Sequence, residues 1–344
     1  MGLFGRKRSS IGLDIGSGFV KVVEVDHSGD QPEVVRVAMR PLLPDAIVEG
    51  EIMDYGLVSD TVRGLFQETG LKGVDVVTAV GGHDVIIKKI EMDRMKESDA
   101  REVIRWEAEQ HVPFDIKSVE LDFQILNPHG DGMQMEVLLV AAKRELVDNK
   151  VALLQDAGVN PRVIDVDAFA LHNAFEHNYP SHRDGIIALV NVGHETTNVN
   201  ILEDGVPILT RDISFGSRKI REDLQRERGL TAEQAEDVVQ AREMIDDLDL
   251  FVSQSAEEVA VGIERASAFL MTRDDGASVG RIFLSGGGAR IPGMARALGQ
   301  RMNVETQLVN PFERVPVQPN AAGGFSIDEA APMLLLPLGL ALRA

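Results

Sequence analysis

One stretch of the chain reads SGGGARIPG and occupies residues 285–293. The apolar run 282–284 before it is typical of a short buried strand, and residues 292–302 after it have the spacing of a helix. Three successive glycines remove side chains where a flat base or a ribose would have to approach the backbone. The start of a helix adds positive potential that favours phosphate. We therefore interpret this stretch as part of a nucleotide-binding site.

Two further segments, one in each half of the chain, resemble each other. Residues 12–16 read GLDIG and residues 190–193 read VNVG, and each is followed by a small polar turn and a return strand. Glycine in such a turn lets backbone N–H groups converge on an anion. A carboxylate at Asp14 would face a metal bound to phosphate, because Mg²⁺ prefers oxygen ligands. A single copy would be an ordinary hairpin turn, but two copies and a triple glycine favour a phosphate site built from both halves.

Other phosphate and metal motifs fit the sequence less well. The pattern GxxxxGK[ST] is absent. Residues 16–18 read GSG but do not open a dinucleotide fingerprint, because Lys21 occupies the third glycine position and a strand is expected to follow in place of a helix. The eight histidines form neither an HExxH motif nor an i,i+4 pair, so a histidine metal site is not expected.

Composition narrows the class of protein. The 344 residues include 55 acidic and 35 basic side chains and no cysteine, for a formal net charge of -20. Such a chain lacks the excess of lysine and arginine that neutralises a phosphate backbone, so nucleic-acid binding is not expected. The absence of cysteine excludes disulfides and thiolate ligands. The length predicts about two domains, with room for an inserted third.

Residues 85–155 are predicted to form that insertion. The expected order is strand, helix, strand, strand and a closing helix, with Ser98 capping the first helix. The one tryptophan, Trp106, is expected to pack in a core, and a partner-binding anchor is the alternative. Elsewhere, Ser59 with Asp60 is predicted to cap a helix, and Thr231 is predicted to cap another within a long charged region.

The two loops and the triple glycine, in this order, resemble the actin/Hsp70/hexokinase nucleotide-binding superfamily. The resemblance implies an α/β fold of two related domains with ATP and Mg²⁺ in the cleft between them, and Asp14 at the metal. The residues that it implies at the nucleotide are Asp14, Gly16, Ser17, Gly18, Lys21, Asn191, Gly193, Gly216, Lys219, Glu236, Gly286, Gly287, Gly288 and Arg290.

Within this superfamily the sequence is most similar to the PilM family of type IV pilus assembly proteins, over essentially the whole chain. The shared features are the basic start GLFGRKR, the loop GLDIGSGFVKVVEV, the inserted unit, the pair Ala235-Glu236 and the ending GLALR. The resemblance implies an actin-like domain I from residues 1–84, 156–185 and 320–344. It implies an inserted SHS2-type (1C) subdomain at 85–155 and domain II at 186–319.

The same resemblance implies a role in type IV pilus biogenesis and twitching motility. The chain would be a cytoplasmic, ATP-binding scaffold, peripheral on the inner-membrane face, alongside other pilus inner-membrane and motor components. It would bind the cytoplasmic N-terminal peptide of PilN in a groove of domain I beside the inserted subdomain. No transmembrane segment is expected, because prolines and a glycine interrupt the apolar run 330–342. The basic arm at residues 6–8 is expected to be a frayed terminus, with contact to an anionic membrane surface as the alternative.

Two departures from the superfamily pattern bear on chemistry. Asn191 stands where an aspartate is usual, and Val239 stands where relatives have a lysine near adenosine. Loss of a carboxylate weakens the ordering of the attacking water more than it weakens phosphate binding by backbone groups. We therefore expect nucleotide binding with slow or negligible hydrolysis.

Two alternatives stay open. One is an FtsA-like cell-division protein that tethers to the membrane; those relatives carry a C-terminal amphipathic helix, whereas this sequence reaches Ala344 directly after GLALR, which favours PilM. The other is a small-molecule kinase of the same superfamily, which would need a catalytic aspartate and a substrate pocket in domain I. The sequence identifies neither.

Overall fold

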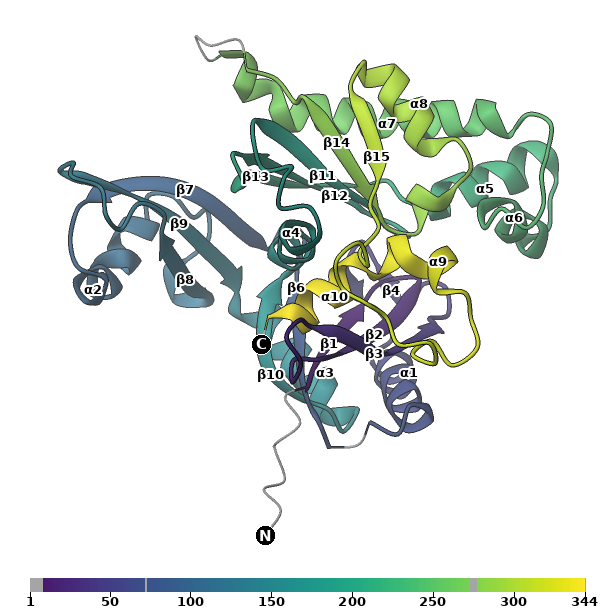
Figure 1. Cartoon of the computed structure of the whole chain (residues 1–344), viewed down its shortest axis with the longest axis horizontal. Coiled ribbons are helices and arrows are strands. Elements are labelled where there is room, and N and C mark those ends of the chain that lie inside the picture. The colour runs from purple at the N-terminus through teal and green to yellow at the C-terminus, as the bar shows by residue number, and fades with distance from the viewer. Residues whose placement is uncertain (1–8, 72, 273–276, 344) are drawn as a thin grey trace. The chain divides into compact units, whose positions relative to one another are not determined.

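The computed structural model describes residues 9–71, 73–272 and 277–343, which divide into two compact units. The first unit comprises Met1–Ala79 with Leu153–Ala344, and the second comprises Val80–Ala152. The predicted basic arm at residues 6–8 lies outside the described residues. Figure 1 traces the chain and labels its elements.

One five-stranded sheet of the first unit has the order β10-β6-β1-β2-β3. Its strands are β1 (Ser9–Ile15), β2 (Phe19–Asp26), β3 (Glu33–Pro41), β6 (Asp75–Val80) and β10 (Asn160–Val166). Successive side chains of a strand point to opposite faces. Val20 and Val22 therefore pack with α1 (Tyr55–Glu68) and the end of α3 (Arg144–Asp156), and Val23 and Val25 pack with α9 (Ile327–Ala330) and α10 (Leu335–Leu342).

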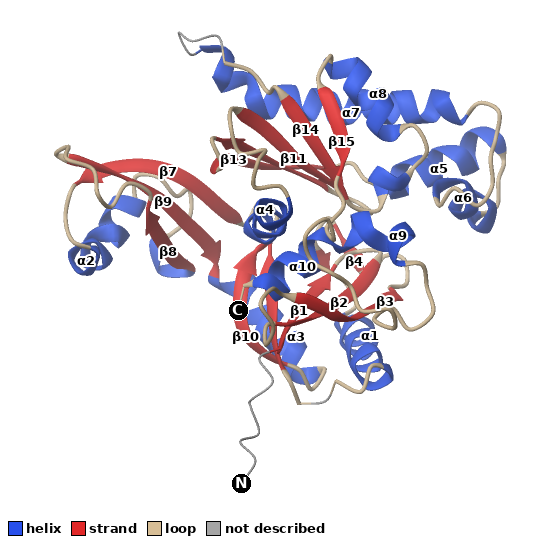
Figure 2. Ribbon diagram, in the orientation of Figure 1, coloured by secondary structure: helices blue, strands red, loops and turns tan. Residues whose placement is uncertain are grey.

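The other five-stranded sheet has the order β13-β12-β11-β14-β15. Its strands are β11 (Ile186–Val192), β12 (Thr197–Glu203), β13 (Val206–Ile213), β14 (Arg281–Ser285) and β15 (Glu305–Leu308). Figure 2 shows helices on both of its sides. One face packs against α5 (Ser217–Arg228), α6 (Ala232–Val239), α7 (Leu248–Ser267) and α8 (Met294–Met302), and the other packs against α4 (Asp167–Asn178) and α10.

The second unit is a three-stranded antiparallel sheet with a helix. Its strands are β7 (Val85–Asp93), β8 (Val119–Ile125) and β9 (Gln134–Lys143), in the order β7-β9-β8, and its helix is α2 (Glu97–Ala108). Ala100, Ile104 and Ala108 recur every four residues and bury one face of α2 in the core. Trp106 lies on the opposite face and is 71% exposed, so the expectation of core packing is wrong.

Helix starts show where local signals mislead. Helix α1 begins four residues before Ser59, because the carboxylate of Asp54 accepts a hydrogen bond from the N–H of Leu57, and the prediction of a cap at Ser59 is wrong. Lys96, not Ser98, precedes the first residue of α2 and makes no side-chain capping bond. Thr231 caps α6 in a complete capping box with Gln234, as predicted.

Short elements complete the chain. A two-stranded ribbon joins β4 (Ile47–Val48) to β5 (Glu51–Ile52). Single 3₁₀ turns lie at Ile116–Ser118, Ala268–Thr272, Gly288–Arg290 and Ala331–Leu334. Among the described residues, no helix has both the length and the apolar character needed to cross a bilayer.

Candidate functional site

The first predicted phosphate loop is the turn between β1 and β2. The N–H of Gly16 donates to the carbonyl of Phe19 at 3.1 Å, which closes the turn. Asp14 and Lys21 are cross-strand partners, and their side chains form an ion pair although each is at most 15% exposed. A half-buried lysine held at a glycine turn is suited to bind phosphate, because its charge is little screened there.

The second loop is the turn between β11 and β12, where Gly193 N–H donates to the carbonyl of Thr196 at 2.9 Å. Asn191 does not point freely into solvent. Its amide nitrogen donates to Oδ1 of Asn198 at 3.1 Å, and its Oδ1 accepts from the hydroxyl of Ser285 at 3.3 Å. Asn198 in turn donates to Asp212 at 2.5 Å. The residue that replaces the usual aspartate is therefore engaged in a polar network across four strands.

The triple glycine follows β14 at the same edge of the sheet as the second loop. Strands β11 and β14 are parallel, and Asn191 is the register partner of Ser285. Gly286 has a φ of 91°, and a Cβ atom there would lie 2.3 Å from the carbonyl oxygen of Val192. Its N–H donates to the carbonyl of Pro332 at 2.7 Å. Glycine is required at this position because any side chain would displace the second loop.

Close backbone contacts bring the loops together. A Cβ atom at Gly18 would lie 3.0 Å from the ring of His194, so the first loop lies directly against the second. A Cβ atom at Gly216 would lie 2.3 Å from the carbonyl oxygen of His194, so the start of α5 also lies against the second loop. Burial, reinforced by Arg221, lowers the pKa of His194 below its ordinary value. His194 is therefore a neutral group between the two loops at pH 7.

Two charged residues of the predicted site, Arg290 and Glu236, lie near the cluster formed by the two loops, the triple glycine and the start of α5. Nη1 of Arg290 lies 3.4 Å from the sulfur of Met333, and burial lowers the pKa of the Arg290 guanidinium. Glu236 on α6 lies close enough to influence Arg290 electrostatically, and its carboxylate accepts from Arg221 at 3.0 Å. A half-buried guanidinium beside a thioether is suited to stack on a base or to bind an anion.

Lys219 lies in the first turn of α5, where its N–H donates to the carbonyl of Gly216 at 3.1 Å. Its Nζ lies 3.4 Å from Asp223, one turn further along α5, and its side chain is 44% exposed. The remaining predicted residues lie in the two loops, in the triple glycine or near them. They are Asp14, Gly16, Ser17, Gly18, Lys21, Asn191, Gly193, Gly216, Glu236, Gly286, Gly287, Gly288 and Arg290.

The donor set fits Mg²⁺ only as an ion held chiefly by phosphate and water. Among residues 9–71, 73–272 and 277–343 no group of three or more His, Cys, Asp or Glu side chains could hold a metal. Asp14 offers one carboxylate, already paired with Lys21, and Asn191 offers an amide oxygen in use by Ser285. Mg²⁺ commonly binds through one or two carboxylates together with substrate phosphates, so the site suits a nucleotide-bound ion.

Sequence reasoning missed several charged residues beside the second loop. Glu195 in the turn is hydrogen-bonded to Arg218 on α5 at 2.7 Å, and Arg218 also lies 2.9 Å from Asp45. The only local signal was the position of Glu195 directly after His194 in a predicted phosphate loop. A negative charge alone would repel phosphate, and the arginine that pairs with Glu195 lies 23 residues further along the chain.

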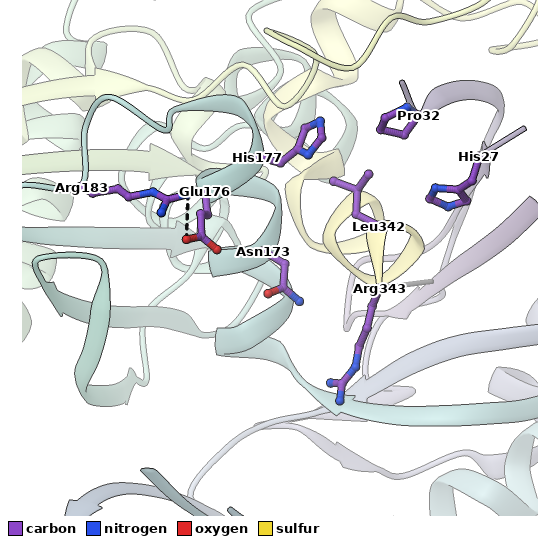
Figure 3. A pocket seen from close by; sticks show the side chains of 8 residues that line it. All are labelled: His27, Pro32, Asn173, Glu176, His177, Arg183, Leu342 and Arg343. Carbon is purple, nitrogen blue, oxygen red and sulfur yellow. Dashed lines mark ion pairs between the residues drawn. The ribbon is translucent and has the colours of Figure 1, made fainter. Parts of the chain in front are cut away.

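Figure 3 shows a separate pocket of about 490 Å³ in the first unit. Arg183 lies 2.9 Å from Glu176 at its wall, and Arg343 pairs with the buried carboxylate of Asp165. Burial lowers the pKa of His177. Both arginines of the pocket are therefore paired with carboxylates, and a ligand would find little unpaired charge there. Its lining residues are His27, Pro32, Asn173, Glu176, His177, Arg183, Leu342 and Arg343, and no predicted nucleotide residue is among them.

Comparison with known protein families identifies the family of this chain. The model of the type IV pilus assembly protein PilM matches residues 12–344. The chain belongs to the PilM family. A solved structure of the PilM-PilN type IV pilus biogenesis complex is similar to it with a TM-score of 0.81 and 29% identity, over 97% of this chain and 98% of that chain.

More distant structures share the fold of this PilM family member. Ethanolamine utilization protein EutJ from Carboxydothermus hydrogenoformans matches with a TM-score of 0.56 and 16% identity, over 99% of this chain and 91% of that one. MreB 5 of Spiroplasma citri bound to AMPPNP matches with a TM-score of 0.53 and 12% identity, over 97% and 95%. The predicted actin-like, two-domain α/β fold is confirmed.

Proposed function

We propose that this PilM family protein is an ATP-binding scaffold of the type IV pilus machinery that binds the cytoplasmic N-terminal peptide of a PilN. The observation that supports PilN as the partner is the match to the PilM-PilN complex over 97% of the chain at a TM-score of 0.81. Attachment to the inner membrane would then come through that partner. The two alternatives, a cell-division tether and a small-molecule kinase, receive no comparable support.

The nucleotide part of the proposal rests on the geometry of the loops. The first loop with Lys21 and the second loop with Gly193 would receive the phosphates, and Gly286–Gly288 with Arg290 would face the nucleoside. Asp14 would hold Mg²⁺ through its carboxylate, and the ion would neutralise phosphate charge when bound. MreB 5 of Spiroplasma citri, which shares the fold, has been solved bound to ADP and to AMPPNP, and this supports nucleotide binding by the fold.

The direct test is calorimetric titration of the purified chain with a PilN N-terminal peptide, with and without Mg·ATP. We expect a Kd in the micromolar range, about -8 kcal/mol. A peptide of scrambled sequence is the control and should give no saturable heat. If ATP binds but the PilN peptide does not, the scaffold assignment is wrong and a divisome or kinase relative becomes the better interpretation.

Hydrolysis is expected to be slow. Because Asn191 supplies no carboxylate and its amide is engaged by Asn198 and Ser285, we expect steady-state phosphate release below about 1 s⁻¹, the low end of ordinary enzymes. The variant Asn191→Asp restores a carboxylate and should raise turnover about tenfold, which is about 1.4 kcal/mol of barrier.

The matched control for this variant is Asn303→Asp, an exposed asparagine at the end of α8. It adds the same charge away from the loops and should leave phosphate release unchanged. Turnover of the unmodified chain above about 1 s⁻¹ would contradict the expectation of slow hydrolysis.

A further inference from the structure

A group of four residues joins residues 42–52, which we call the β4–β5 segment, to the second loop. The N–H of Glu49 donates to Oε2 of Glu195 at 2.9 Å. Nη1 of Arg218 lies 2.7 Å from Oε1 of Glu195 and 2.9 Å from Oδ1 of Asp45. Both carboxylate oxygens of Glu195 thus accept a hydrogen bond, one from the backbone of Glu49 and one from the side chain of Arg218. We refer to Asp45, Glu49, Glu195 and Arg218 as the clamp.

The clamp is attached to both predicted phosphate loops. On one side, the N–H of Leu42, at the start of the β4–β5 segment, donates to the carbonyl of Gly18 at 2.9 Å. On the other, Glu195 lies in the second loop, and the N–H of Arg218 donates to the carbonyl of His194 at 2.8 Å. The first loop and the β4–β5 segment therefore cannot move away from the second loop without breaking the clamp.

Burial makes the Glu195–Arg218 pair stronger than a surface ion pair. The side chain of Glu195 is 10% exposed and that of Arg218 is 28% exposed. The guanidinium of Arg218 donates hydrogen bonds to the carboxylates of Glu222 and Glu195, which hold the pKa of Arg218 above its ordinary value, so the guanidinium stays charged. Charge-assisted hydrogen bonds in a partly desolvated place are stronger than neutral ones. Removal of Arg218 would leave the Glu195 carboxylate without its charged partner.

Two residues of the β4–β5 segment have an unusual backbone conformation. Asp45 has a φ of 62° and Glu49 a φ of 50°, a left-handed conformation that residues with a Cβ atom seldom adopt. Such conformations persist where surrounding contacts hold them, and they are frequent at ligand clamps and switches. Here Glu49 contacts Glu195 of the second loop, and Asp45 contacts Arg218 of α5.

We propose that Glu195 and Arg218 are positioning residues that hold the two phosphate loops closed over a bound nucleotide and thereby set its rate of release. This inference rests on the proposed binding of ATP. With the clamp formed, the β4–β5 segment is held against the second loop and α5. With the clamp broken, the two halves of the first unit separate and the nucleotide leaves faster.

The test is the release of a fluorescent ATP analogue from the full chain, chased with excess unlabelled Mg·ATP in a stopped-flow instrument. We expect Arg218→Met, which keeps most of the apolar stem, to increase the release rate at least tenfold. The milder variant Asp45→Asn, at an exposed site, should increase it about threefold. Arg226→Met on the same helix removes an exposed arginine that pairs with Asp223 and should leave the rate unchanged.

A double-variant comparison separates the clamp from a general loss of packing. If the clamp acts as a unit, Asp45→Asn in the Arg218→Met background should add nothing, because its partner is already gone. Additive effects, or release rates of Arg218→Met and Asp45→Asn equal to that of the unmodified chain, would overturn the inference while leaving ATP binding intact. No saturable ATP binding by the unmodified chain would instead overturn the proposed function, and the clamp's role with it.

Discussion

Replacement of Gly339 by alanine is expected to lower the free energy of unfolding by about 3 kcal/mol, at the upper end of overpacking effects. A Cβ atom at this position would lie 1.7 Å from the carbonyl oxygen of Ala170 on α4. A second backbone contact lies nearby, since a Cβ atom at Gly12 of β1 would lie 2.0 Å from the carbonyl oxygen of Pro337. Helix α10 is thus packed between α4 and β1 with no room for a methyl group, and the substitution must separate them.

The measurement is the denaturant midpoint followed by circular dichroism, and Gly56→Ala is its matched control. Gly56 is an exposed glycine in the first turn of α1, where a Cβ atom would come no closer than 3.7 Å to another residue. Alanine is the better helix former, so this variant should be neutral or more stable by up to about 1 kcal/mol. Equal stabilities of the two variants would show that α10 can move away from α4 without cost.

The second large effect is expected at Lys21. Lys21→Ala should weaken Mg·ATP binding about 100-fold, which is about 2.7 kcal/mol. The variant loses the cation that faces the phosphates and leaves the half-buried carboxylate of Asp14 unpaired. An unpaired carboxylate beside a phosphate repels it, so both consequences act in the same direction.

Calorimetry with Mg·ATP measures this effect, and a second variant identifies its cause. Lys21→Ala combined with Asp14→Asn removes the repulsion and should recover part of the affinity, although it also removes the proposed metal ligand. Lys88→Ala, at an exposed lysine on β7, is the control for loss of one positive charge and should bind as the unmodified chain does. A change of less than threefold for Lys21→Ala would show that the first loop does not contact phosphate.

Local sequence was enough to predict the loops and the family. A glycine turn between two strands is set by residues next to one another, and the chemistry of Asp14, Lys21 and the triple glycine is visible without any fold. The structure places the second loop and Gly286 at one sheet edge, because parallel β11 and β14 end together. The helix cap at Thr231 could be predicted for the same reason, since its partner Gln234 is close in sequence.

Helix boundaries and burial were predicted less well. Asp54 rather than Ser59 begins α1, because both residue types can cap a helix and only the backbone conformation selects one of them. Trp106 is expected in a core, which is the more frequent place of a lone tryptophan. Its place in the helical repeat of Ala100, Ile104 and Ala108 puts it on the solvent face instead.

The clamp and the packing of α10 could come only from the folded chain. With 35 basic and 55 acidic residues, the sequence permits a very large number of ion pairs, and nothing local selects Arg218 with Glu195 and Asp45. Glu49 and Glu195 are 146 residues apart and meet only after two sheets have formed and closed on each other. Strand, turn and glycine signals are short-range and can be interpreted residue by residue, whereas contacts between distant segments depend on how the hydrophobic faces of both sheets are buried.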